Sequence, residues 1–277
     1  MKLRCGDRFL DLSSTKIMGV LNATPDSFSD GGQFNSGDSA IQRAEDMLGQ
    51  GAAIIDVGGE STRPGAVRVS IQQELDRVIP VVEKISKNLD VCISVDSSSP
   101  EVMVAAKNAG AHLLNDVRAL QRGGALQAAK VMGLPVCLMH MQGEPDTMQK
   151  NPEYAGVLDD VYVFLAKRIQ ACNQAGIDNN QILIDPGFGF GKTAQHNYTL
   201  LAKLERFKTL GVPLLVGMSR KSMIGDALGG VGVSDRVIGS VSAAVIAAMN
   251  GAHIVRVHDV KETYQALEVV RATKAQI

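Results

Sequence analysis

The stretch AIIDVGG at residues 53–59 decides the fold of this chain, because seven other segments of the 277 residues resemble it. Each is short, rich in Val, Ile and Leu, and carries a polar or charged residue near its C-terminal edge. Apolar runs without polar alternation are typical of strands that are buried on both faces, as in a parallel sheet. The eight segments are residues 17–22, 53–59, 92–96, 113–116, 135–140, 182–185, 213–219 and 254–258.

Helical spacing fills the gaps between these segments, and several of the predicted helices end at glycine. The expected helices are residues 37–50, 71–88, 100–109, 124–132, 154–175, 196–207, 234–249 and 260–272. Strand and helix therefore alternate through the whole chain, at about 35 residues a unit, which is the spacing of a (β/α)8 barrel. We predict a single TIM-barrel domain over residues 1–277.

In such a barrel the C-terminal edges of all strands meet on one face, where active sites are built. The polar residues at these edges are expected to converge there: Asn22, Asp56, Asp96, Asn115, His140, Asp185, Ser219, Arg256 and His258. Two long polar loops, residues 23–36 and 60–70, follow strands on the same face and are predicted to be binding loops or lids.

Composition excludes several classes of partner. A formal charge of −1 and a pI near 6.5 give no basic field for nucleic acid or an anionic membrane, and the chain has no Trp for base stacking. No apolar stretch approaches the length of a membrane span, and the N-terminus does not resemble a secretory signal. The four cysteines are scattered without a C-x-x-C pair. We expect a cytoplasmic protein that acts on small molecules.

Three carboxylates, Asp56, Asp96 and Asp185, follow apolar residues at predicted strand ends. A buried carboxylate needs donors, because burying an unpaired charge is costly. A flat heterocycle with adjacent N–H groups would satisfy them. The alternative is that each caps a helix or pairs with Arg or Lys.

The cations of the same face suggest a phosphorylated guest. Arg256 and His258 are two residues apart and so point the same way from a strand, and with Arg63 they offer a polyanion three donors. Lys192 and the pair at residues 220–221 also follow predicted strands. Each could alternatively form a surface salt bridge. The amide of Asn22 could hold Mg²⁺ that arrives with a polyphosphate.

Other chemistries are disfavoured. Residues 185–193 end in Gly-Lys-Thr, but a P-loop needs glycine where Pro186 stands. His140 is expected to be a hydrogen-bonded histidine of the barrel rim, since no zinc or serine-hydrolase motif accompanies it.

From about residue 17 to the C-terminal helix, the chain resembles the dihydropteroate synthase family of folate biosynthesis, the target of sulfonamides. The resemblance rests on residues 19–32, 56–65, 94–96, 115–116, 185–192, 219–222 and 256–259. It implies that 6-hydroxymethyl-7,8-dihydropterin diphosphate and 4-aminobenzoate react to give 7,8-dihydropteroate and pyrophosphate. Family members are thought to ionise the C–O bond first, before the arylamine attacks.

The resemblance also implies roles for residues. Asp96, Asn115 and Asp185 would hydrogen-bond the pterin edge, with Lys221 against the ring. Thr62, Arg63, Arg256 and His258 would lie near the anionic groups, and Asn22 would bind Mg²⁺. Phe28, Pro64 and Ser222 would form the 4-aminobenzoate pocket. The catalytic residues implied are Asp96, Asp185, Lys221 and Arg63.

Two alternatives remain at this point. A pterin-binding methyltetrahydrofolate-type methyltransferase barrel would share the Asp and Asn ring, but it has no need of Arg63 or of the loop that carries Phe28. A catalytically silent barrel would be expected to lose some of these groups. The family also implies a homodimer, although the small-residue helix at residues 240–250 is equally consistent with core packing.

Overall fold

A computed structural model describes residues 1–23, 36–60, 69–145 and 147–276. The strands are β1 Lys2–Cys5, β2 Arg8–Asp11, β3 Lys16–Asn22, β4 Ile54–Gly58, β5 Cys92–Asp96, β6 Leu113–Asp116, β7 Val136–Met139, β8 Ile182–Asp185, β9 Leu215–Val216 and β10 Ile254–Val257. The α-helices are α1 Ser36–Gly49, α2 Ile71–Asn88, α3 Pro100–Ala109, α4 Ala125–Met132, α5 Val157–Gln174, α6 Ala194–Ala202, α7 Ser222–Ala227, α8 Val237–Met249 and α9 Val260–Lys274. Within these residues no helix is both long and apolar enough to cross a membrane.

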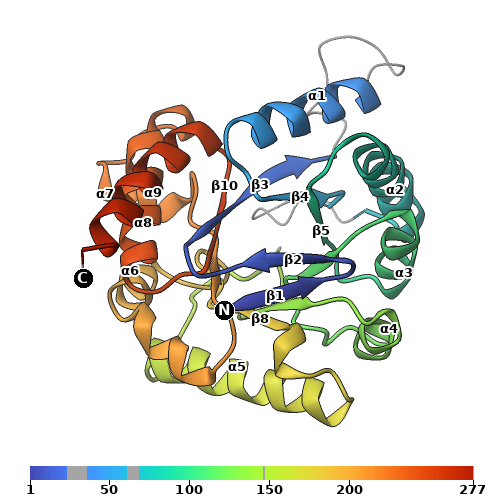
Figure 1. Cartoon of the computed structure of the whole chain (residues 1–277). Helices are drawn as coiled ribbons and strands as arrows, with labels where there is room; N and C mark the ends of the chain where they lie inside the picture. The colour runs from blue at the N-terminus through green and yellow to red at the C-terminus, as the bar shows by residue number, and fades with distance from the viewer. Residues whose placement is uncertain (24–35, 61–68, 146, 277) are drawn as a thin grey trace.

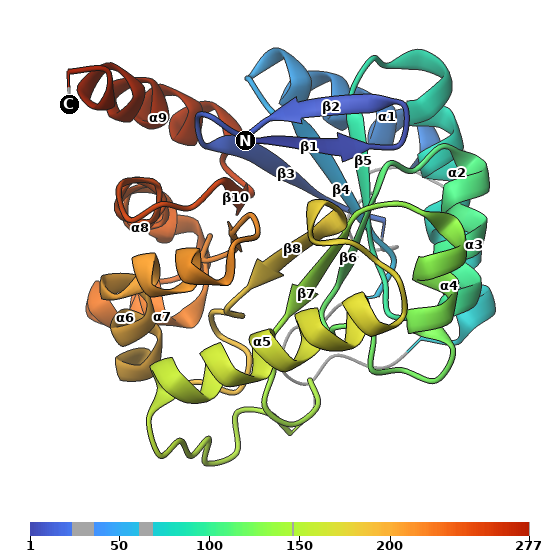
Figure 2. The same cartoon turned by 60° about the horizontal axis from the view of Figure 1, so that its bottom comes forward.

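The strands from β3 to β10 form one parallel sheet in the order β8-β7-β6-β5-β4-β3-β10-β9. A single bridge between Ile184 and Leu214 brings its two edges together, so the sheet is a nearly closed barrel. Helices surround the strands on the outside (Figure 1, Figure 2). The predicted (β/α)8 barrel is therefore confirmed.

The predicted boundaries differ from the structure in a few places. The segment at residues 213–219 keeps only two residues of strand, Leu215–Val216, because the chain turns away at Gly217. The N-terminal hairpin, β1 paired antiparallel with β2, was not expected from the sequence. The short helix α7 was also missed.

Alternation along the strands separates a closed barrel floor from an open mouth. The first inward residue of each barrel strand is apolar and buried in one cluster: Met18, Ile54, Cys92, Leu113, Cys137, Leu183, Leu215 and Ile254. Leu3 and Cys5 of the hairpin join this cluster and close the floor, and the hairpin lies across that end of the barrel (Figure 1).

Side chains at alternate positions of a strand share a face, so the next inward residue on each strand lies one layer nearer the mouth. On β4, β6, β8 and β10 that residue is Asp56, Asn115, Asp185 and Arg256. The period of two thus places polar groups above an apolar floor.

The turn after β8 crosses the end of β7 at very close range. Gly187 has φ +71°, and a Cβ atom there would stand 1.8 Å from the carbonyl oxygen of His140. We predict that Gly187→Ala lowers the free energy of unfolding by about 3 kcal/mol or more, because backbone strain adds to overpacking. The measurement is chemical denaturation at 25 °C.

Gly211→Ala is the matched control. Gly211 has a similar φ of +73°, but an added Cβ would meet no atom within 4 Å. It should lose only the left-handed backbone term, about 1 to 2 kcal/mol. Equal losses for the two variants would contradict the close crossing.

Candidate functional site

Arg256 joins two carboxylates at the barrel mouth. Its Nε donates to Oδ2 of Asp56 at 2.6 Å, and its Nη2 donates to Oδ2 of Asp96 at 2.9 Å. The side-chain amide of Asn115 also donates to Asp56, at 3.3 Å. Side chains of β4, β5, β6 and β10 thereby form one hydrogen-bonded group. The sequence predicts that Arg256 binds an anionic ligand, and the structure shows that it also pairs with two of the carboxylates.

Burial raises the pKa of two carboxyl groups of the mouth, Asp96 and Asp185. Desolvation raises the pKa of Asp96 from 3.8 to about 7, against the lowering effect of Arg256, and the nearby charge of Asp56 raises it further. Desolvation also raises the pKa of Asp185, which Lys221 opposes. The mouth therefore holds buried carboxyl groups whose ionised form is stabilised when a ligand supplies N–H donors.

Lys221 follows β9, the strand that pairs with β10, and stands at the start of α7. Its ammonium donates to the carbonyl oxygen of Phe188 and lies 4.5 Å from the ring centre of Phe190. Desolvation lowers the pKa of Lys221 to about 8, while Asp185 raises it. Asp185 accepts the backbone N–H of Gly187 at 2.7 Å. A cation and a carboxyl group thus face the same space from different strands.

Lys192 is not a rim cation, and its inclusion among the possible anion-binding groups was wrong. Its side chain is buried, and Nζ donates to the carbonyl oxygens of Gly187 at 2.8 Å and Phe190 at 3.0 Å. The same atom lies 2.9 Å from Nδ1 of His140. Burial lowers the pKa of Lys192 well below its usual range, and burial with the nearby Lys192 lowers that of His140 to about 3. These two residues fix the turn after β8.

Arg220 is likewise occupied, because it forms a two-point ion pair with Asp259. His258 lies at the end of β10, where its Nδ1 is 3.1 Å from the hydroxyl of Ser219. Ser222 is exposed at the first position of α7. The expected placement of His258 and Ser222 at the mouth agrees with their positions after β10 and β9.

An apolar wall completes the mouth. Val117, Met139, Met148 and Phe190 form a separate buried cluster with Met141 packed on it. Flat ligands pack well on methionine and aromatic side chains. The mouth therefore combines hydrogen-bonding groups on one side with an apolar surface on another.

Asn22 ends β3 and is half buried. Among the residues described, no cluster of three or more His, Cys, Asp or Glu side chains could hold a metal ion. Four residues named from the sequence, Phe28, Thr62, Arg63 and Pro64, lie outside the described residues.

Comparisons with known proteins agree with one another. The pterin binding enzyme family matches residues 18–258. Dihydropteroate synthase of Escherichia coli strain K12 is 58% identical over 273 residues, which are 99% of this chain and 96% of the relative.

Two solved structures are similar over the whole fold. A sulfonamide complex of the Yersinia pestis dihydropteroate synthase has a TM-score of 0.95 at 56% identity, and covers 99% of this chain and 100% of that one. The Xanthomonas albilineans dihydropteroate synthase in complex with 7,8-dihydropteroate has a TM-score of 0.91 at 44% identity, with 99% of each chain covered.

The raised pKa of Asp96 predicts a pH dependence of stability. Between pH 3.8 and about 7 the folded chain binds more protons at this residue than the unfolded chain does. The contribution of Asp96 to stability therefore decreases as pH rises through that window, by up to about 1.4 kcal/mol per pH unit. We predict that Asp96→Asn removes this slope from the unfolding free energy, measured by denaturation between pH 5 and 8.

The control is Asp178→Asn, an exposed residue that precedes β8 at the other end of the barrel. It should keep the slope of the unmodified protein. An unchanged slope in Asp96→Asn would show that Asp96 is ionised throughout.

Proposed function

The chain belongs to the dihydropteroate synthase family and is a transferase, and we propose how its residues join 6-hydroxymethyl-7,8-dihydropterin diphosphate to 4-aminobenzoate. The observation that carries the proposal is the convergence of Asp96, Asn115 and Asp185 at the barrel mouth, beside a bridging Arg256. These acceptors and the apolar wall suit a flat heterocycle with several adjacent N–H groups. The identity to known synthases leaves the methyltransferase alternative without a specific observation in its favour.

The three side chains bind and orient the pterin ring. Carboxyl groups whose pKa is raised by burial gain strongly from N–H donors, because charge-assisted hydrogen bonds are the strong ones. Lys221 lies against the ring and reaches its polar edge, held in place by the carbonyl of Phe188.

Charge stabilisation then drives the departure of the diphosphate. The C–O bond breaks with its electron pair going to the diphosphate, and the pterin ring delocalises the positive charge left on the methylene carbon. The amine nitrogen of 4-aminobenzoate attacks that carbon and loses a proton. The leaving group would lie near Arg63, Thr62, Arg256 and His258. Stabilising its negative charge in this way can lower the activation free energy by several kcal/mol.

Mg²⁺ would enter this site bound to the diphosphate of the substrate. It prefers oxygen ligands, keeps several waters and takes only one or two protein ligands beside substrate phosphates. The amide oxygen of Asn22, at the end of β3, would be such a ligand. Bound there, Mg²⁺ would supply positive charge beside the diphosphate.

Phe28 and Pro64, which lie outside the described residues, would line the 4-aminobenzoate pocket, with Ser222 close by. Ser222 follows Lys221 at the beginning of α7, so this pocket adjoins the cation that contacts the ring. The close position of the two substrates keeps water from capturing the cation.

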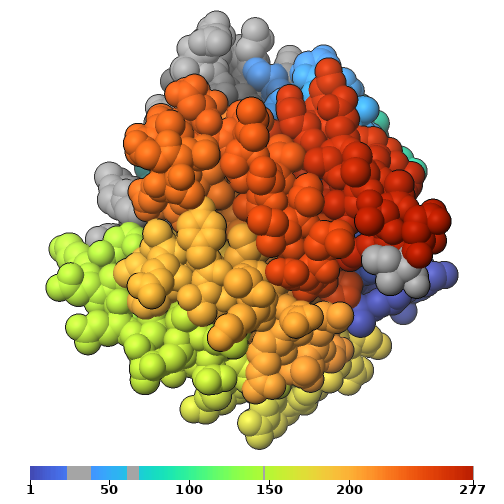
Figure 3. Space-filling model, turned by 90° about the vertical axis from the view of Figure 1, so that its left-hand side faces the viewer, coloured from blue at the N-terminus to red at the C-terminus, as the bar shows by residue number. Residues whose placement is uncertain are grey.

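The proposed partner of the chain is a second copy, docked on helix α8. Helices α6 to α9 build one face of the molecule (Figure 3). On α8, Ile238 is 80% exposed and Ile246 and Met249 are nearly half exposed, at helical spacing along one side. An exposed apolar stripe of this kind is typical of a protein interface.

We also propose that the protein works in the cytoplasm, where thiols stay reduced. All four cysteines, at positions 5, 92, 137 and 172, are free and buried.

The test of the reaction is pyrophosphate release from the dihydropterin diphosphate with Mg²⁺, with and without 4-aminobenzoate, while dihydropteroate is followed by chromatography. We expect equal amounts of pyrophosphate and dihydropteroate when both substrates are present.

Asp185→Asn should weaken pterin binding about 10- to 100-fold, since a hydrogen bond to a charged group is lost. Calorimetry measures that affinity.

Asp178→Asn is the control and should bind pterin normally, because Asp178 precedes β8 whereas Asp185 ends it. Pterin binding without product under any condition would contradict the synthase. Unchanged pterin affinity in Asp185→Asn would contradict the assignment of that carboxylate.

The dimer is tested by Ile238→Glu. A charge at the most exposed residue of the apolar stripe should shift the protein to monomers in sedimentation velocity, because a buried unpaired charge is costly. Val131→Glu, at a residue 71% exposed on α4, is the control and should leave the mass unchanged. A monomeric unmodified protein, or a dimer in the Ile238 variant, would contradict this interface.

A further inference from the structure

The turn that follows β6 is strained, and it begins at the residue next to Asn115. Ala119 and Leu120 have φ of +51° and +57°, although neither is glycine and both are buried. Residues other than glycine rarely adopt this left-handed backbone conformation. It costs about 1 to 3 kcal/mol per residue and persists only where the surrounding structure holds it. Strain of this kind tends to lie at functional sites.

A buried carboxylate holds the turn from inside. Asp116 is completely buried and accepts the backbone N–H groups of Arg118 at 2.8 Å and Leu120 at 2.7 Å. It also accepts the hydroxyl of Ser98, which stands two residues after Asp96. Asp116 thereby links the end of β6 to the end of β5 and directs the side chain of Arg118 outward over the barrel rim.

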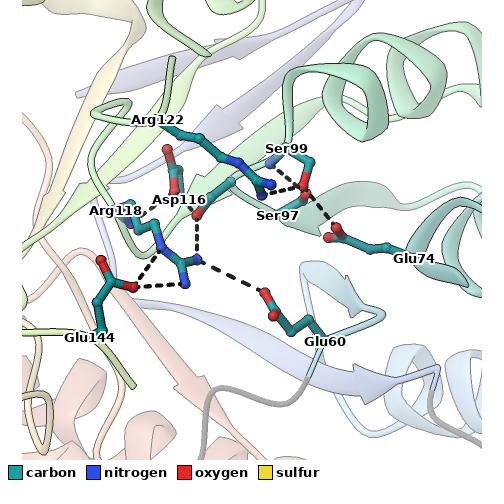
Figure 4. Close-up of polar contacts among 9 residues, drawn as sticks. Glu60, Glu74, Ser97, Ser99, Asp116, Arg118, Arg122 and Glu144 are labelled. Atoms are coloured by element: carbon teal, nitrogen blue, oxygen red, sulfur yellow. Dashed lines mark hydrogen bonds and ion pairs between the residues drawn. The ribbon is translucent and has the colours of Figure 1, made fainter. Parts of the chain in front are cut away.

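The guanidinium of Arg118 then gathers groups from the neighbouring strand ends (Figure 4). Nη1 donates to Ser98 at 3.3 Å, and Nη2 donates to Oε2 of Glu144, beyond β7, at 3.2 Å. Nη1 also lies 3.9 Å from Oε2 of Glu60, two residues after β4. One side chain of the turn after β6 therefore contacts groups that follow β4, β5 and β7.

Side-chain packing does not fill the space around these contacts. A cavity of about 350 Å³ is lined by Glu60, Arg118, Arg122, Met139 and Glu144, among others. The strand ends are joined across it by directional polar contacts, for which the planar fork of arginine is suited. Removing the fork leaves room for these ends to shift.

We propose that Arg118 is a positioning residue of the pterin site: its guanidinium, through Ser98, Glu60 and Glu144, holds the segments that follow β4, β5 and β7, and so fixes Asp96 and Asn115 without touching the pterin. This inference rests on the proposed function, in which those two side chains bind the pterin edge. Displacement by about 1 Å at such a site can reduce activity up to roughly 100-fold. The effect should fall on the pterin substrate, because the ends of β5 and β6 carry Asp96 and Asn115.

The experiment compares Arg118→Met with Arg168→Met. Arg168, on α5, donates to the carbonyl oxygens of Ala119 at 2.8 Å and Leu120 at 3.4 Å, so it supports the same turn without contacting Ser98, Glu60 or Glu144. For each variant, Tm and the KM of both substrates are measured. Arg118→Met should raise the KM for the dihydropterin diphosphate about 10-fold.

Arg168→Met should lower Tm and leave both KM values within about 2-fold. Arg118→Lys keeps the charge but not the fork, so it should raise the pterin KM to an intermediate value, and it serves if the Met variant does not fold. A pterin KM at the unmodified level in Arg118→Lys or Arg118→Met, with only Tm lowered, would overturn the proposal. So would equal KM changes in the Arg118 and Arg168 variants. Failure of the proposed function would appear separately, as normal pterin affinity in Asp185→Asn.

Discussion

The structure depends on keeping three carboxylates, Asp56, Asp96 and Asp185, inside the mouth of a barrel whose floor is apolar. Arg256 pairs with the first two, and Lys221 opposes the raised pKa of the third. The compensation is incomplete, because Oδ1 of Asp56 lacks a hydrogen-bond partner in the described part of the chain. Burying such groups without hydrogen-bond donors is unfavourable, so a ligand that brings N–H donors binds with a favourable free energy. The same imbalance that destabilises the free protein thus creates the site.

The strands and the turns that follow them hold these carboxyl groups in place at the mouth. The period of two along each strand brings the polar residue above the apolar floor, and the N-terminal hairpin closes the floor from below. Lys192 holds the turn after β8 by three backbone carbonyls and His140. Asp116 holds the turn after β6 by two backbone N–H groups. Buried polar groups with full sets of partners therefore carry the rigidity that apolar packing supplies elsewhere.

Much of the fold could be predicted from the sequence, because apolar runs and helical spacing are local signals. Helices 71–88 and 100–109 have the predicted bounds, and the eight strands close in the predicted order of a barrel. The convergence of Asp96, Asn115 and Arg256 also followed from the barrel itself. The partner of each ionic group could not be predicted from the sequence. Lys192 follows β8 and Arg256 lies near the end of β10, but only tertiary geometry turns Lys192 inward to backbone carbonyls. The strained turn at residues 119–120 gives no sequence signal, because neither residue is glycine.

We propose that the carboxyl groups of the mouth accept the hydrogen bonds of the pterin. The decisive experiment is calorimetry of a pterin at pH 7 in two buffers of different ionisation enthalpy, which gives the number of protons exchanged on binding. Asp96, with a pKa of about 7, is only partly ionised in the free protein, and N–H donors favour its ionised form. We expect a net release of protons that disappears in Asp96→Asn. Binding with no proton release, or with the same release in that variant, would contradict it.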